Sequence, residues 1–77
     1  MNKQRRKRIM ECINKLEQIQ YELEAIRDEE QGAFDNLPES LQSSEKGEVM
    51  EEYIDYINDA DDTITDAIDY LDNINNY

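Results

Sequence analysis

Apolar residues recur at alternating intervals of three and four positions in two long segments of this chain. In the first segment they are Ile9, Cys12, Leu16, Ile19, Leu23 and Ile26. In the second they are Met50, Tyr53, Ile57, Ala60, Ile64, Ala67, Leu71 and Ile74. This spacing is that of the a and d positions of a heptad, which form one stripe along an α-helix. The pattern predicts helices over about residues 3–31 and 45–76.

The segment between the two stripes, residues 32–44, predicts a reversal of the chain. It contains the only proline, Pro38, which is favourable in the first turn of a short helix. Its apolar side chains are expected to cover the end of the helix pair; they are Phe34, Leu37 and Leu41. We therefore expect a single all-α domain: an antiparallel two-helix hairpin, coiled-coil-like, with a short helical turn in its linker.

Large and small residues of the two stripes match in one antiparallel register, in which paired positions sum to 76. Leu16 then faces Ala60, and Ile9 faces Ala67, which lets the two backbones approach closely. In the same register Cys12 is expected to be a small buried core residue.

The second helix carries more apolar side chains than one neighbouring helix covers. Six lie at e and g positions: Val49, Ile54, Tyr56, Ile68, Tyr70 and Tyr77. A stripe of this width is typical of a bundle of three or more helices. It predicts a two-fold homodimer in which two hairpins form a four-helix bundle. The alternative is that these six residues bind another protein.

Composition narrows the range of functions. The net charge of −12 argues against nucleic acid or an anionic membrane surface as the main partner. The chain has no His and one Cys, so it lacks the commonest general base and a His/Cys metal site. A lone cysteine suits a reducing cytoplasm, and no apolar run is long enough to cross a membrane. We expect a non-enzymatic protein with no catalytic residue, cofactor or metal.

Six carboxylates of the second helix recur at c and f positions and form an acidic stripe: Glu52, Asp55, Asp59, Asp62, Asp66 and Asp69. Along the helix axis they follow one another at about 5 Å, near the spacing of phosphates in a nucleic-acid strand. One interpretation is that the stripe imitates DNA and occupies a basic groove of a nucleic-acid-binding protein. The other is a solvated face that keeps a small protein soluble.

Five cations precede the first stripe: Lys3, Arg5, Arg6, Lys7 and Arg8. In the predicted register they lie beside Asp69 and Asp72, and we expect these carboxylates to neutralise them. The alternative is a contact of this cluster with a partner or with nucleic acid. The segment 58–62, Asn-Asp-Ala-Asp-Asp, lacks the glycine and the final glutamate of a calcium loop, so it predicts no metal site.

The linker also carries a sequence signature. Glu29-Glu30, then Phe-Asp-Asn-Leu-Pro-Glu-Ser-Leu-Gln over residues 34–42, then Ser44-Glu45, resembles a pattern in small, largely uncharacterised helical-hairpin proteins of bacteriophages and mobile elements of low-GC Gram-positive bacteria. The resemblance covers about residues 22–60. It implies a phage- or prophage-encoded protein inside the bacterial cytoplasm, and small acidic proteins of this origin often inhibit host enzymes or defence systems by binding them.

Taken together, the sequence predicts a protein that binds a host defence or nucleic-acid-binding protein through the acidic stripe. A homodimer is expected, without direct contact to nucleic acid or membrane. The alternative is a structural or adaptor coiled coil that binds through the apolar side chains of the second helix, with carboxylates that serve only solubility.

Overall fold

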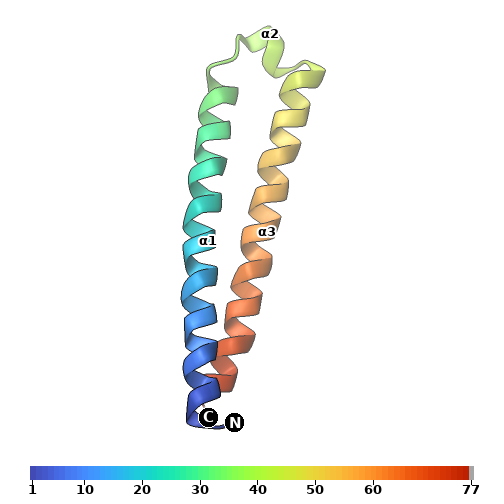
Figure 1. Ribbon diagram of the computed structural model, residues 1–77. Helices are drawn as coiled ribbons and strands as arrows, with labels where there is room; N and C mark the ends of the chain where they lie inside the picture. Colours follow the sequence, from blue (N-terminus) through green and yellow to red (C-terminus); the bar gives the residue numbers. More distant parts are fainter. Residues whose placement is uncertain (77) are drawn as a thin grey trace.

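Residues 1–76, which the computed structural model describes, form three helices and contain no strand. α1 spans Lys3–Asp35, α2 spans Glu39–Gln42, and α3 spans Glu45–Asn75. The predicted all-α class is confirmed. α1 and α3 lie side by side and run in opposite directions, so that Lys3 and Asn75 are at the same end of the rod (Figure 1). The molecule measures 58 by 15 by 13 Å.

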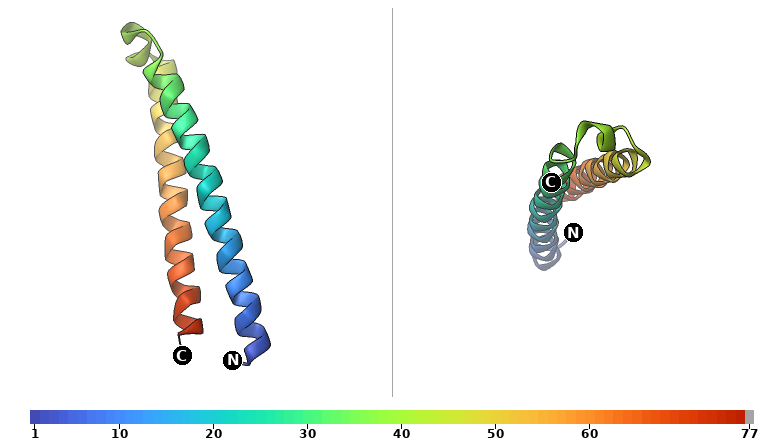
Figure 2. Two further views of the ribbon diagram at one scale, coloured as in Figure 1. Left: turned by 90° about the vertical axis from the view of Figure 1, so that its left-hand side faces the viewer. Right: turned by 90° about the horizontal axis from the view of Figure 1, so that it is seen from above.

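The two long helices cross at a small angle. In Figure 1 they approach each other at the end that holds the start of α1, whereas in the first view of Figure 2 they approach at the end that holds α2. Helices that pack at such an angle keep one strip of side chains in contact over their whole length. We call this strip of facing residues the seam.

The seam positions of both helices are three and four residues apart, and each is buried or half-buried. In α1 they are Arg6, Ile9, Ile13, Leu16, Gln20, Leu23, Arg27, Glu30 and Phe34. In α3 they are Gly47, Met50, Ile54, Ile57, Asp61, Ile64, Ile68, Leu71 and Asn75. The buried apolar side chains are Ile13 and Ile54, with 2% and 8% of their surface exposed. The helix pair therefore has a narrow contact strip instead of an enclosed core.

The seam uses one row of each helix that the heptad assignment did not predict. Ile13, Gln20 and Arg27 take the places expected for Cys12, Ile19 and Ile26. In α3, a row that includes Ile54, Asp61 and Ile68 replaces the row that includes Tyr53 and Ala60. The predicted burial of Cys12 is wrong, since this side chain is exposed.

Polar side chains in the seam explain this change, because they find partners across it. Gln20 Nε2 donates to the main-chain oxygen of Asp61 at 3.2 Å and to Thr65 Oγ1 at 2.8 Å. Arg27 Nη1 donates to Asn58 Oδ1 at 3.1 Å. Half-buried polar groups are tolerated when they are hydrogen-bonded in this way.

A third polar contact joins the helix ends. Asn75 Nδ2 donates to the main-chain oxygen of Arg6 at 3.2 Å, and the Arg6 guanidinium donates to the carbonyl oxygen of Ile74. Arg6 thus brings a cation to the last turn of α3, which has no basic residue of its own. The pairs across the seam sum to between 80 and 85, so the predicted register of 76 is wrong.

The register differs because α1 is longer than the predicted 3–31. It continues to Asp35, and its end is held by Gln42, whose Nε2 donates to the carbonyl oxygens of Phe34 and Leu37 at 3.2 Å each. The chain reverses over residues 36–44, later than the predicted 32–44, which moves the centre of the turn towards α3. α3 begins at Glu45 as predicted and ends at Asn75, one residue earlier than predicted.

α2 and the first turn of α3 meet at Gly47, which is buried. A Cβ atom at this position would lie 2.1 Å from the carbonyl oxygen of Gln42 and 2.7 Å from that of Leu41. Both contacts are far inside van der Waals distance and involve backbone atoms. The close approach of linker and helix therefore depends on a residue without a side chain.

Candidate interaction surfaces

The six carboxylates of the acidic stripe lie together on the outer side of α3. All six are exposed: Glu52, Asp55, Asp59, Asp62, Asp66 and Asp69. Their positions fall about half a helical turn away from the seam positions of α3, so the stripe faces away from α1. The structure thus brings together on one side the residues that sequence periodicity assigned to one face.

No cation neutralises this stripe within the described part of the chain. The ion pair found in residues 1–76 joins Arg27 and Asp28 at 3.4 Å, and residues 48–77 contain no Lys or Arg. Glu52 instead accepts a hydrogen bond from the Tyr56 hydroxyl at 2.8 Å. This bond and the charge of Glu52 raise the pKa of Tyr56 above its ordinary value. The stripe is an uncompensated row of negative charge on water-exposed helix.

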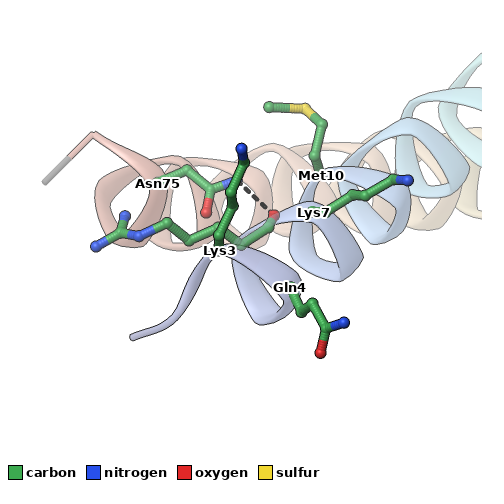
Figure 3. A pocket seen from close by; sticks show the side chains of 6 residues that line it. Lys3, Gln4, Lys7, Met10 and Asn75 are labelled. Atoms are coloured by element: carbon green, nitrogen blue, oxygen red, sulfur yellow. Dashed lines mark hydrogen bonds between the residues drawn. The ribbon is translucent and has the colours of Figure 1, made fainter.

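The five cations of α1 form the basic cluster, and of these Arg6 reaches the C-terminal end of α3 through the carbonyl oxygen of Ile74. No ion pair joins Asp69 or Asp72 to the five cations in residues 1–76. The cluster surrounds α1 and borders shallow depressions on two sides. One depression is lined by Lys3, Gln4, Arg6, Lys7, Met10 and Asn75 (Figure 3). The other is lined by Met1, Arg5, Arg8, Ile9 and Cys12.

The two broad faces of the helix pair differ in polarity. On one face, Gln20 reaches Thr65, and a depression spans both helices. It is lined by Glu17, Gln20, Tyr21, Glu24, Thr65 and Ile68. We call this the polar face.

The opposite face is apolar, and most of its side chains are exposed. Next to the seam it carries one row from each helix, and we call these rows the open apolar face: Cys12, Ile19 and Ile26 from α1, and Tyr53, Ala60, Ala67 and Ile74 from α3. Ile19, Ile26 and Tyr53 expose 48%, 42% and 55% of their surface. These two rows lie on the same side of the helix pair because α1 and α3 are antiparallel and each row is on the side of its helix away from the polar face.

Sequence reasoning placed these residues in the core. Five of them are exposed instead, whereas Ala67 and Ile74 are half-buried. Sequence reasoning assigned the six e and g residues of the second helix to the exposed apolar surface, and in the structure only some of them are exposed. Ile54 is buried against α1 and Ile68 is half-buried in the seam, so they do not belong to an exposed face. Tyr56 and Tyr70 are exposed, and Val49 is half-buried beside the open apolar face. Tyr77 lies outside the described residues.

The apolar linker residues lie at the end of the pair, as a cap on the turn. Phe34 and Leu37 are half-buried, and Leu41 exposes 42% of its surface.

The sequence held a signal for the altered seam, because the isoleucines at 13, 54 and 68 lie outside the a and d rows. The polar residues in the same rows, Gln20, Arg27 and Asp61, were not recognised as seam residues.

The described residues contain no group of three or more Cys, Asp, Glu or His side chains arranged to hold a metal ion. Neither long helix has, within residues 1–76, the length of apolar sequence that a membrane crossing needs. Comparison with known proteins gives no relative: no protein-family model, curated protein or solved structure matches this chain.

Proposed function

We propose that this chain is a non-enzymatic binding protein whose acidic stripe engages the basic, nucleic-acid-binding surface of a partner protein. The observation that carries the proposal is the position of the six carboxylates, all exposed on one side of α3 and without a cation to compensate them. Like charges at these spacings disfavour an isolated helix by about 0.2–0.5 kcal/mol for each pair. A function in binding gives a reason for keeping them.

The resemblance of residues 22–60 to phage and mobile-element proteins supports a more specific form of this proposal. In it, the chain is a phage- or prophage-encoded inhibitor that binds a host defence or nucleic-acid-binding protein in the bacterial cytoplasm. Carboxylates that follow one another along a rigid helix offer a basic groove the charge pattern of a phosphate backbone.

The test is capture of proteins from a bacterial lysate on the immobilised chain. We expect a captured protein to be displaced by duplex DNA and by a rise in salt, because both compete for the same charges. Asp59→Lys/Asp62→Lys/Asp66→Lys should reduce its affinity by about a hundredfold or more, since like charges then face each other.

The matched control is Glu11→Lys/Glu17→Lys/Glu24→Lys, which changes the net charge equally but lies on α1. It should bind the captured protein with an affinity much closer to that of the unaltered chain. Equal affinity of the α3 triple variant and the unaltered chain would rule out the acidic stripe as the binding site.

A second candidate function is that of a structural or adaptor protein that binds through apolar side chains. The exposure of Ile19, Ile26 and Tyr53 on the open apolar face favours it. This function predicts capture that persists or strengthens at high salt and that Ile19→Ser abolishes. Salt dependence therefore separates the two candidates.

We also propose that the helix pair acts as a hairpin that forms a homodimer, a four-helix bundle closed by the open apolar faces. The support is the small number of buried side chains, because a chain of this size rarely has enough core to be stable alone. Analytical ultracentrifugation at micromolar concentration should give twice the chain mass of 9.2 kDa. A monomer at that concentration would contradict the dimer.

A further inference from the structure

The open apolar face adds to an accessible surface that is large for a chain of this mass. The surface amounts to 5933 Å², whereas a compact monomer of the same mass exposes about 4,900 Å². The rod shape contributes to this excess of about 1,000 Å², which is close to the roughly 800 Å² that each partner buries in a standard interface. A second copy of the chain offers a face of equal length and matching composition.

A row of four charged residues runs along the α1 edge of this face at seven-residue intervals. The row consists of Arg8, Lys15, Glu22 and Glu29. All four are exposed, and none forms an ion pair within residues 1–76. The first three each precede a residue of the row Cys12, Ile19 and Ile26 by four positions, so the charged row borders the face. We call it the edge row.

The charges of the edge row follow the order positive, positive, negative, negative. Two copies of this order complement each other only when they run in opposite directions. If the two α1 helices are centred on Ile19, Arg8 meets the partner's Glu29 and Lys15 meets the partner's Glu22. Charged pairs at the rim of an interface contribute mainly to orientation and specificity, and in this arrangement the pairs along the edge row are all attractive.

The corresponding edge of α3 carries no charge. Its residues at the same spacing are Val49, Tyr56, Thr63 and Tyr70. In the open apolar face beside them, the small side chains of Ala60 and Ala67 let two copies of α3 approach closely. The acidic stripe lies further out on α3, beyond this uncharged edge.

We propose that two chains pack their open apolar faces head to tail, with α1 along the partner's α1 and α3 along the partner's α3. This inference rests on the homodimer proposed above and specifies its geometry. Its consequence is that both acidic stripes lie on one flank of the dimer, as two antiparallel rows about 10 Å apart. In the other two-fold arrangement, α1 lies along the partner's α3 and the stripes are on opposite flanks.

Charge exchange along the edge row tests the geometry. Arg8→Glu/Lys15→Glu makes the row entirely negative and should weaken the dimer at least about tenfold. Adding Glu22→Lys/Glu29→Lys gives the order negative, negative, positive, positive. Two copies of this order again complement each other when they run in opposite directions, so dimerisation should return. The control Lys3→Glu/Lys7→Glu changes the net charge as much as the first variant but lies off the edge, so it should have a much smaller effect. Helical circular dichroism verifies that each variant is folded.

Disulfide trapping gives an independent measurement, since Cys12 is the only cysteine and is exposed. In the head-to-tail dimer Cys12 lies near the partner's residue 26, so Ile26→Cys should yield a covalent dimer on mild oxidation. In the other two-fold arrangement Cys12 lies near the partner's residue 67, and Ala67→Cys should do so instead. Cys12→Ser removes the cross-link in either case.

The outcomes separate the geometry from the dimer itself. A monomer in the ultracentrifuge contradicts both. A dimer that cross-links through Ala67→Cys, or that the fourfold charge exchange does not restore, contradicts only the head-to-tail geometry. Recovery in the fourfold variant together with cross-linking through Ile26→Cys establishes it.

Discussion

Gly32 and Gly47 both lie inside long helices, and their surroundings differ completely. No atom lies within 4 Å of the place that a Cβ would take at Gly32, whereas at Gly47 backbone atoms of the linker already occupy it. Glycine in a helix reduces stability relative to alanine unless space forbids a side chain. Only Gly47 therefore has a structural reason to be glycine.

Gly32→Ala and Gly47→Ala should change stability in opposite directions. The first should raise the free energy of unfolding by up to about 1 kcal/mol, through helix propensity alone. The second should lower it by about 1–3 kcal/mol, because α2 must move away from α3. Thermal unfolding followed by circular dichroism measures both. A Gly47→Ala variant as stable as Gly32→Ala would show that the linker does not hold its position against α3.

Tyr56 reports the negative potential of the acidic stripe. Its hydroxyl donates to Glu52, and this bond together with the carboxylate charge raises the pKa of the phenol. Glu52→Gln should lower the pKa of Tyr56 towards that of an ordinary tyrosine. The measurement is a difference titration at 295 nm between chains with and without Tyr56→Phe. An unchanged pKa would mean that Glu52 is not the hydrogen-bond partner.

The sign of the linked stability change follows from the raised pKa. The folded chain favours the protonated phenol of Tyr56, so this contribution is fully present below the ordinary tyrosine pKa. It is lost as the pH rises through the raised value. The stabilising contribution of the hydrogen bond between Tyr56 and Glu52 is therefore lost at alkaline pH.

At the scale of the helices, two side-chain oxygens of the seam are buried without a hydrogen-bond partner: Asp61 Oδ1 and Asn75 Oδ1. Asp61 Oδ1 is buried and makes no hydrogen bond, and its neighbours in the same row of α3 are Ile54 and Ile68. The bond from Gln20 goes to the main-chain oxygen of Asp61, so it does not depend on the carboxylate. A carboxylate oxygen in this position is a cost to stability.

Asp61→Leu should therefore stabilise the helix pair by about 1–2 kcal/mol, through apolar contact and relief of the unpaired oxygen. Asp62→Leu is the control, because Asp62 is exposed on the acidic stripe. Chemical unfolding curves of the two variants give the comparison. If Asp61→Leu is no more stable than Asp62→Leu, the carboxylate of Asp61 has a partner across the seam or is open to water.

The two long helices and the turn were predictable from the sequence. The rotation of each helix about its own axis, which decides the rows that form the seam, was not. Intervals of three and four residues, with Pro38 between them, are sufficient to place two long helices and a turn. The heptad rule then selects the most apolar rows for the seam. In the structure, Gln20 and Arg27 occupy the seam because Asp61 and Asn58 offer them acceptors. Hydrogen bonds of this kind depend on register, which periodicity does not determine.

On the scale of the whole molecule, this rotation separates three surfaces. The acidic stripe occupies the outer side of α3, the polar face lies on one side of the seam, and the open apolar face lies on the other. The stripe was predictable because exposed carboxylates at heptad intervals share a side whatever the seam is. The open apolar face was not, because its residues are the ones that a two-helix seam was expected to bury.

Cys12 lies on that open apolar face and has a consequence for chemistry as well as for packing. Its thiol is exposed in a single chain, and the proposed dimer would shield it. The rate at which a soluble reagent alkylates it therefore measures how often the face is uncovered. In a chain without another cysteine, this one reaction rate would report the occupancy of the open apolar face.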